Sequence, residues 1–318
     1  MPVEIADWND LDNVQNDLSG DYVLVNDLDS GTDGYAGIGD DFEPIGFIED
    51  GEFTSEFGGS FDGDGFEIAD LVIEYDGLDS GDIAFFASTD DGSLIENLSV
   101  GGSFTVTNSD GVNFSGLVGD NNSIIQNCVS HVDVTVPEGR NVGGLVGSNF
   151  DTVTDSYATG SVEGDEEVGG FVGVESGTDS DQGIRRCYSY GTVTGNSNVG
   201  GFCGQLGGSF TPGYIFDSYV DIGESGQDDA IGTIDFEGES DVTELSTSEM
   251  QGSEAETNMD AFDFSNTWDS VLESDGDTTA DGYPILLAVD RENQLEAQGI
   301  FQELQPPEPP QNLTAELL

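Results

Sequence analysis

Cationic side chains are the rarest charged groups in this sequence, and their rarity restricts the reactions that the chain could catalyse. Its 318 residues include 66 aspartates plus glutamates but only four cationic residues, Arg140, Arg185, Arg186 and Arg291. A polysaccharide lyase needs a cation that neutralises the substrate carboxylate and a base that removes the neighbouring proton. Arg185 and Arg186 are adjacent and would point to opposite faces of a strand, and Arg140 lies in a predicted turn. We therefore expect no lyase site.

Carboxylates are abundant, but no pair of them is distinguished by its spacing. A glycoside hydrolase brings carboxyl groups together on one face, at a separation that sets the stereochemistry of its reaction. With 66 acids in the chain, such pairs arise by chance. We identify no catalytic residue and expect a non-enzymatic protein, with a polysaccharide-active enzyme as an alternative.

One acidic turn near the C-terminus offers oxygen ligands at a spacing that suits calcium. Asp275, Asp277 and Asp281 lie around a glycine turn, and Ca²⁺ prefers carboxylate and carbonyl oxygens. The segment lacks the glutamate that closes an EF-hand loop, and acidic turns are frequent in a chain of this composition. The sequence therefore favours solvated turns over a structural calcium or other cation site, and we expect no further cofactor.

Tyrosines recur on strand-like segments and are the best candidates for ligand binding. They are Tyr157, Tyr188, Tyr190 and Tyr219. Aromatic faces stack on sugar rings, so a ladder of tyrosines on an outer surface could bind a glycan. The same stacking would stabilise neighbouring coils of the protein without any ligand. Both interpretations are compatible with the sequence.

Four asparagines begin N-x-S/T sequons, at Asn97, Asn113, Asn121 and Asn312. They are candidate glycosylation sites if the chain meets a glycosylation system. His131 is the single histidine, and we expect it on the outer surface without a specific role.

Internal repeats indicate the architecture that must position these residues. The segments FSGLVG, VGGLVG, VGGFVG and VGGFCG recur at 114–119, 142–147, 168–173 and 199–204. Their apolar anchors, together with Phe85 of a degenerate upstream copy, are 26 to 32 residues apart. A strand-like partner segment broken by glycine follows each motif. Units that bury only one face must stack on one another, which predicts coils of β-strands rather than helices.

The period of two along the partner segments predicts which side chains face inward. Cys128, Ser156, Cys187 and Ser218 align on one face, and Tyr157, Tyr188 and Tyr219 align on the other. Small residues should therefore line the interior, and the tyrosines should lie outside. Cys128 and Cys187 would be two coils apart, about 10 Å, which is too far for a disulfide. We expect free thiols.

The motif GGLVG and the segments around it resemble the GLUG-motif family. The resemblance extends to LSGDYVLVNDLD at 18–29, to FGGSFDGDGFEIADLVIEY at 57–75 and to the segment 247–286, and covers most of residues 15–290. It implies an all-β fold, a right-handed parallel β-solenoid (β-helix), in surface or secreted microbial proteins that are usually adhesive. It implies no particular reaction.

The pattern along the chain divides it into four parts. Residues 1–18 have apolar residues at helical spacing and predict a short helical cap. Residues 19–235 contain the glycine-rich solenoid, and residues 236–290 are expected to close its C-terminal end. Residues 291–318 are expected to form an arm and a proline-rich anchoring tail.

The net charge of −62 is typical of a protein adapted to very high salt. The Debye length falls to about 3 Å at 1 M salt, so that multimolar salt would screen the repulsion between the carboxylates. Four arginines cannot neutralise a phosphate backbone against so many acids, so we expect no nucleic-acid binding. No segment has the length of apolar sequence that a membrane-spanning helix needs.

These features favour a structural or adhesive protein. The preferred hypothesis is a virion protein of a halophilic archaeal tailed virus, such as a capsid turret, spike or tail fibre, on the virion surface. Its partners would be a host glycan or surface-layer glycoprotein and, through the C-terminal tail, other virion proteins. The start of the sequence, without an export signal, favours this hypothesis over a haloarchaeal cell-surface or extracellular adhesin. A homo-oligomer, either a trimer or a pentamer, is expected.

The high negative charge predicts that the stability of the protein depends on salt concentration. Lowering KCl from multimolar to millimolar concentration should accelerate unfolding, because the carboxylates then repel one another with less screening. Unfolding rates measured by tryptophan fluorescence at both salt concentrations test this. Equal rates at both concentrations would contradict the proposed adaptation to salt.

Overall fold

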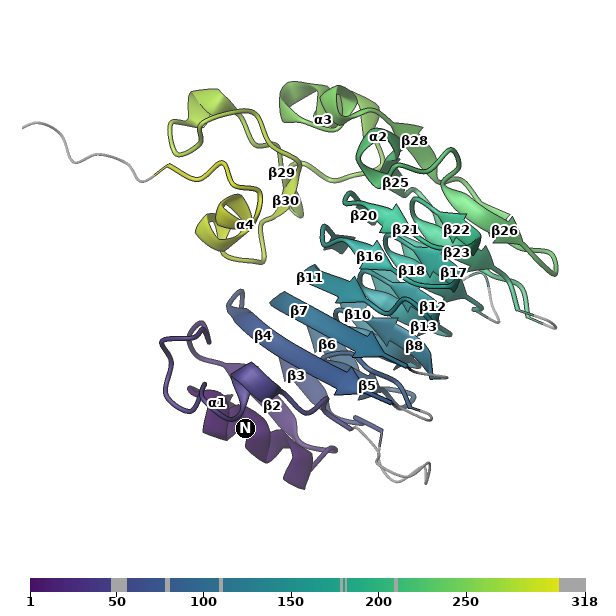
Figure 1. The fold of residues 1–318 in the computed structure, drawn as a ribbon. Helices are drawn as coiled ribbons and strands as arrows, with labels where there is room; N and C mark the ends of the chain where they lie inside the picture. Colours follow the sequence, from purple (N-terminus) through teal and green to yellow (C-terminus); the bar gives the residue numbers. More distant parts are fainter. Residues whose placement is uncertain are drawn as a thin grey trace, which may run out of the picture.

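The computed structural model describes residues 1–302 apart from 47–55, 78–80, 109–110, 178–179, 181 and 209–210. The described residues form a parallel β-solenoid, as the repeats predict. Figure 1 shows its strands stacked from the N-terminal coils to the C-terminal coils, with the last part of the described chain lying beside the stack.

One turn of the solenoid passes through four sheets, which we call A, B, C and D in the order in which the chain enters them. In a central turn the four strands are β10 (Ile124–Gln126), β11 (Val129–Thr135), β12 (Arg140–Gly143) and β13 (Val146–Asn149). The chain then returns to sheet A at β14 (Thr152–Thr154), which pairs in parallel with β10.

The remaining strands extend the same four sheets. Sheet A also contains β1 (Val3–Ile5), β2 (Asp21–Leu24), β3 (Ser60–Asp62), β6 (Leu94–Glu96), β19 (Gly183–Arg185), β24 (Tyr214–Phe216) and β27 (Glu239–Ser240). Sheet B also contains β4 (Glu67–Asp76), β7 (Ser99–Thr107), β15 (Tyr157–Ala158), β16 (Val162–Glu163), β20 (Tyr188–Ser189), β21 (Val193–Thr194), β25 (Tyr219–Asp221) and β28 (Thr243–Leu245). Sheet C also contains β8 (Val112–Ser115), β17 (Glu166–Gly169) and β22 (Ser197–Gly200). Sheet D also contains β5 (Phe86–Ser88), β9 (Val118–Asn121), β18 (Val172–Glu175), β23 (Cys203–Leu206) and β26 (Ile231–Ile234).

The core consists of columns in which each coil places an apolar side chain above its neighbour. In sheet A the inward column is Phe61, Ile95, Ile125, Val153, Ile184 and Ile215, and each of these residues is fully buried. The inward orientation predicted for Cys128 and Cys187 agrees with their complete burial. Both are free thiols, as predicted, and burial raises the pKa of Cys128 to about 12. These thiols therefore act as small apolar core residues.

The glycines of the repeated motif allow the backbones of sheets C and D to approach closely. A Cβ atom on Gly147 would lie 2.8 Å from the backbone carbon of Asn113 in the preceding coil, so a larger residue does not fit. The apolar anchors of the motif, Leu145, Phe171 and Phe202, are completely buried. The rings of Phe171 and Phe202 stack with centroids 4.8 Å apart. The motif thus combines a close backbone contact with one large core side chain.

Sheet D contains a column of buried side chains that is polar. The amide of Asn121 donates to Asn149 Oδ1 at 2.7 Å, and the amide of Asn149 donates to Glu175 Oε2 at 2.6 Å. The other oxygen of Glu175 accepts from the backbone N–H of Gly177 at 3.0 Å. All three side chains of this column are fully buried. Burial raises the pKa of the Glu175 carboxyl to about 8.

Short helices cover the first coil. β1 is the outermost strand of sheet A, and it is followed by α1 (Trp8–Asp12) and the 3-10 helix η1 (Asn13–Asn16). Trp8, Leu11 and Val14 from these helices are completely buried in the solenoid core. The helical pattern in 1–18 therefore covers the core as expected, except that residues 3–5 form a strand.

The C-terminal part of the described chain lies along a flank of the solenoid rather than across its end. β27 and β28 are still strands of sheets A and B, so residues 236–245 belong to the solenoid. We call residues 246–302 the flanking module. Its elements are η3 (Thr247–Glu249), α3 (Gly252–Asn258), β29 (Trp268–Asp269), η4 (Glu273–Asp275), β30 (Ile285–Leu286) and α4 (Arg291–Ala297). Figure 1 shows α3, α4 and the β29–β30 pair beside sheet B.

The helices of this fold are short. α2 (Ile222–Ser225) follows β25, and η2 (Gly39–Asp41) lies in an N-terminal loop. Within the described ranges, no helix has the length and apolar composition that crossing a membrane requires. The arm that we expected from residue 291 begins instead as α4, a part of the flanking module, and the tail from residue 303 lies outside the described residues.

The polar column in sheet D predicts an unusual dependence of stability on pH. The folded-state pKa of Glu175 is raised above the unfolded value of 4.5, so the folded state holds this proton more tightly. The contribution of Glu175 to stability is therefore greatest below pH 4.5 and falls as the pH rises toward about 8. The variant Glu175→Gln cannot ionise and should lose less stability between pH 5 and 8 than the unaltered protein.

Denaturant unfolding at constant multimolar KCl measures this difference. The variant Glu273→Gln, at an exposed carboxylate of η4, is the control and should keep the pH dependence of the unaltered protein. Parallel pH profiles for Glu175→Gln and the unaltered protein would show that Glu175 does not carry the effect.

Candidate functional site

The predicted tyrosine ladder forms on the outer face of sheet B. Tyr157 is paired with Tyr188, and Tyr188 with Tyr219, in consecutive parallel strands. The rings of Tyr157 and Tyr188 stack with centroids 4.8 Å apart and planes 10° from parallel. The period-two pattern thus gives the correct face and register for these residues.

The flanking module covers this ladder, so the tyrosines are not available to a sugar in this structure. Tyr157 and Tyr188 are completely buried, and Tyr219 is 3% exposed. The module residues that pack against them include Met250, Met259, Phe262, Trp268, Tyr283 and Leu286. The surface-exposed glycan site that we predicted at Tyr157, Tyr188, Tyr190 and Tyr219 is therefore wrong, because the module packs against these residues. The aromatic face instead forms the core between the solenoid and its module.

The tyrosine hydroxyl groups hold the module in one position along the ladder. Tyr157 donates to Gln294 Oε1 at 2.9 Å, and Tyr188 donates to the carbonyl of Pro284 at 2.6 Å. Tyr219 accepts from the backbone N–H of Ala261 at 3.1 Å. Each of these contacts is on a different coil, so the module spans three consecutive coils. Burial raises the pKa of the Tyr219 hydroxyl to about 12.

A second row of contacts lies beside the ladder. The rings of Tyr190 and Tyr283 stack with centroids 3.8 Å apart, and their planes are 6° from parallel. Tyr283 also donates from its hydroxyl to Asp221 Oδ2 at 2.7 Å. Tyr190, the fourth predicted sugar-binding residue, is thus engaged by the module as well.

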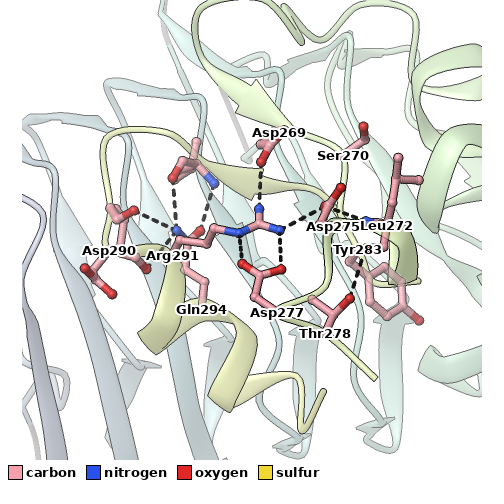
Figure 2. Close-up of polar contacts among 12 residues, drawn as sticks. Asp269, Ser270, Leu272, Asp275, Asp277, Thr278, Tyr283, Asp290, Arg291 and Gln294 are labelled. Carbon is pink, nitrogen blue, oxygen red and sulfur yellow. Dashed lines mark hydrogen bonds and ion pairs between the residues drawn. The ribbon is translucent and has the colours of Figure 1, made fainter. Parts of the chain in front are cut away.

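The predicted calcium ligands lie in the module, but they surround an arginine. Arg291 Nε contacts Asp277 Oδ2 at 2.8 Å, and its Nη2 contacts Asp275 Oδ2 at 3.0 Å. Its Nη1 contacts Asp269 Oδ2 at 2.7 Å, and Figure 2 shows the guanidinium between the three carboxylates. Asp281 does not join them and accepts from the backbone N–H of Glu273 instead.

The acidic turn is therefore not arranged as a cation site. The guanidinium occupies the position where a metal ion would have to bind Asp275 and Asp277. Its hydrogen bonds lower the pKa of the Asp277 carboxyl. Within the residues that the structure describes, no three His, Cys, Asp or Glu side chains are placed so that they could hold a metal ion. The sequence could not show this arrangement, because Arg291 lies 14 residues beyond Asp277.

Gln294 and Asp290 fix α4 beneath this cluster. The Gln294 amide donates to the carbonyls of Leu286 and Val289, each at 2.9 Å, and its oxygen accepts from the Leu286 N–H at 2.8 Å. Asp290 caps the helix by accepting from the N–H of Glu292 at 2.8 Å. Gln294 therefore joins β30, α4 and the tyrosine ladder through one buried side chain.

His131 lies on the outer face of sheet B, as expected, and its ring contacts a neighbouring coil of the solenoid. Nδ1 is 2.7 Å from Thr159 Oγ1, and the ring meets Tyr157 edge to face. Nε2 is buried without a hydrogen-bond partner, and so is Nε1 of Trp268 in the module. Desolvation lowers the pKa of His131 to about 4, so the ring is neutral at physiological pH.

The sequon asparagines in the described residues are structural. Asn97 donates to Asp62 at 3.0 Å and accepts from Asn127 at 3.1 Å, and Asn113 donates to Asp82 at 2.8 Å. The third, Asn121, is completely buried in the polar column. A glycan on these amides would break contacts between coils, so the prediction of glycosylation sites at Asn97, Asn113 and Asn121 is wrong for the folded chain. Asn312 lies outside the described residues.

The other arginines are held by carboxylates or lie on an aromatic ring. Arg186 forms a two-point contact with Asp155 at 2.8 and 2.7 Å, and Arg140 lies 3.2 Å from Glu166. The guanidinium of Arg185 lies 4.7 Å from the centre of the Phe216 ring. The arrangement of the described residues gives no support for lyase chemistry.

Comparison with known proteins supports the repeat assignment. Residues 138–163 match the family model of the GLUG motif. A stretch of 157 residues, 49% of this chain, is 32% identical to Halomucin from Haloquadratum walsbyi. This chain spans 1% of the length of that protein.

The fold also has a counterpart among solved structures. It superposes on a Bacteroides ovatus protein described as a "putative immunoglobulin A1 protease" with a TM-score of 0.57. The sequences are 19% identical, and the match covers 91% of this chain and 93% of the other. At this identity the similarity concerns the fold alone.

The contacts of Arg291 predict a stability effect that is specific to the module. Replacing Arg291 by glutamine leaves three aspartates close together without a cation, and should lower the free energy of unfolding by about 1–2 kcal/mol. The control is Arg140→Gln, because the Arg140 side chain is 54% exposed and its ion pair should contribute less than about 0.5 kcal/mol.

Chemical denaturation followed by tryptophan fluorescence is suitable, since Trp268 lies in the core that the module forms with sheet B. Equal losses of stability in the two variants would show that the Arg291 cluster does not hold the module.

Proposed function

We propose that this chain is a non-enzymatic attachment element on the surface of a halophilic microbe or of a particle that infects one. The observation that carries the proposal is the similarity of half of the chain to a haloarchaeal halomucin, on a chain with a net charge of −62. A surface with this charge stays hydrated and repels itself unless salt screens it. Such a protein is suited to the outside of an organism in brine.

The rigidity of the fold supports a structural role. Consecutive coils are joined by parallel strand pairing in sheets A to D, and the module ties several coils together along sheet B. A stack of this kind keeps its two ends at a fixed separation. It would therefore present a binding surface at a constant distance from an anchoring point.

The absence of catalysis is part of this proposal. The carboxyl groups of Glu67 and Asp82 have pKa values raised to about 7, which is a property that acid catalysts share. In both cases the first cause is burial within the wall of the solenoid, and the Asp82 carboxylate accepts from Asn113 of the next coil. Burial therefore raises both pKa values without a substrate, and the hydrogen bond from Asn113 lowers the pKa of Asp82 in part.

Two placements of the attachment role are compatible with a stiff acidic solenoid. The similarity to halomucin favours a cell surface or extracellular location. A turret, spike or tail fibre of a halophilic archaeal virus is the finer form of the proposal, in which the chain contacts a host glycan or surface-layer glycoprotein. Immunogold labelling of intact cells and of purified virus particles distinguishes the two placements.

Adsorption to cells tests the attachment role itself. The purified chain, labelled with a fluorophore, should bind haloarchaeal cells saturably in multimolar KCl, and excess unlabelled chain should displace it. A second highly acidic protein of similar size and without a solenoid is the control for non-specific association. Binding that is equal to this control would reject the attachment role.

The same preparations test the absence of catalysis. Neutral and acidic polysaccharides incubated with the chain in multimolar KCl should show no new reducing ends and no unsaturated products. Cleavage that is lost when one pair of carboxylates is replaced would overturn this part of the proposal.

A further inference from the structure

The outer face of sheet A contains a strip of eight positions without a carboxylate. On β10, β14, β19 and β24, the residues on either side of the buried column face outward. They are Ile124, Gln126, Thr152, Thr154, Gly183, Arg185, Tyr214 and Phe216. We call these residues the acid-free strip.

The strip differs from the coils on both sides of it. The equivalent outward positions hold Asp62 and Glu96 toward the N-terminus and Glu239 toward the C-terminus. About one residue in five of the chain is acidic, 66 of 318. Carboxylates beside the strip are paired: Asp155 is bound to Arg186. Asp151 accepts from Thr152 Oγ1 at 3.1 Å, and Glu96 accepts from the Gln126 amide at 2.6 Å. Four successive strands without an acidic outward residue thus distinguish this part of sheet A from the coils on both sides of it.

The strip also exposes apolar surface that the rest of the fold does not require. Ile124 is 42% exposed, and Phe150, in the loop before β14, is 36% exposed. The rings of Tyr214 and Phe216 lie 6.2 Å apart at 29°, and the guanidinium of Arg185 lies over Phe216. The pair Tyr214–Phe216 at one end of the strip and Ile124 at the other are therefore candidate contacts for a partner.

Sheet A and sheet B thus treat their outer aromatic residues differently. On sheet B the tyrosines are buried by the flanking module, which supplies its own aromatic residues. On sheet A, Tyr214 and Phe216 are only half-buried, and Ile124 is exposed at the other end of the strip, three strands away. Of these two aromatic faces, the one on sheet A is therefore the more accessible.

The chemistry of the strip fits an uncharged glycan. Aromatic rings stack on the C–H faces of sugars, and the threonine hydroxyls and the glutamine amide can exchange hydrogen bonds with sugar hydroxyls. Four strands at about 4.8 Å spacing offer a flat surface about 14 Å long, which suits a short oligosaccharide. A ligand on these four strands would stack on outward side chains that carry no negative charge.

Polyanions fit less well, because carboxylates lie at both ends of the strip and would repel them. Proteins adapted to the same salt carry acidic surfaces of their own and meet the same repulsion. The contrast in charge between the strip and its surroundings therefore selects for a neutral partner.

We infer that the acid-free strip of sheet A binds a neutral glycan. This inference rests on the proposed attachment function and gives it a location and a ligand class. Tyr214 and Phe216 form the apolar contact at one end of the strip, and Ile124 forms it at the other. Between them, Gln126 Oε1 and the hydroxyls of Thr152 and Thr154 accept hydrogen bonds from the sugar.

The experiment compares strip variants with matched surface variants of the full chain. Ile124→Asp and Phe216→Ser change the strip, whereas Ile234→Asp and Leu287→Asp change side chains that are 58% and 55% exposed elsewhere. Binding is measured in multimolar KCl to haloarchaeal cells and to a panel of neutral hexose and N-acetylhexosamine oligosaccharides. Circular dichroism and unfolding curves identify any variant that has not folded.

The inference predicts that each strip variant loses at least tenfold in affinity for cells and for one class of neutral oligosaccharide. The two control variants should stay within twofold of the unaltered chain. If the unaltered chain and the strip variants bind cells equally, the strip is not the binding surface, although the attachment function stands.

Two further outcomes separate the ligand from the function. If the strip variants lose cell binding but enzymatic removal of cell-surface glycans does not reduce the binding of the unaltered chain, the partner is a protein and the glycan inference is overturned. If the unaltered chain binds a neutral oligosaccharide through the strip but does not bind cells, the glycan site stands and the attachment function fails.

Discussion

The coils of this protein must be held together almost without ion pairs, and the rest of the structure depends on this constraint. With 66 acids and four arginines, charge cannot attract one coil to the next. Stacking relies instead on apolar columns, on backbone pairing in four sheets and on amide ladders such as Asn121 to Asn149. The few arginines are placed where carboxylates would otherwise repel, as Arg186 is beside Asp155 and Arg291 is among three aspartates of the module.

The repeats predicted what depends on local periodicity. Alternation of side chains gave the inward orientation of Cys128 and Cys187 and the outward orientation of Tyr157 and Tyr188, since neighbouring coils share one register. The glycine motif likewise pointed to a stacked β-fold, and the reason is a backbone contact that leaves no room for a Cβ at Gly147. These features repeat in every coil, so that each copy reinforces the inference from the others.

The position of the flanking module could not be predicted in this way. The hydrogen bond from Tyr157 to Gln294 joins residues 137 positions apart, and no periodicity relates them. A tyrosine ladder and a separate tryptophan-containing segment were both visible in the sequence, but not that one covers the other. The same limit applies to Asp275 and Asp277, because only the fold brings Arg291 between them. It also applies to the acid-free strip, whose residues come from four coils.

Two aromatic faces of this solenoid therefore have different roles. Sheet B uses its tyrosines to hold the flanking module, and sheet A leaves Tyr214 and Phe216 accessible for a partner. Tyrosine nitration in multimolar KCl, read by mass spectrometry with and without bound cells, tests this division most directly. The account predicts that Tyr214 is nitrated in the free chain and protected on binding, while Tyr157 and Tyr188 stay unmodified in both states. Nitration of Tyr157 or Tyr188 in the free chain, with protection on binding, would contradict it.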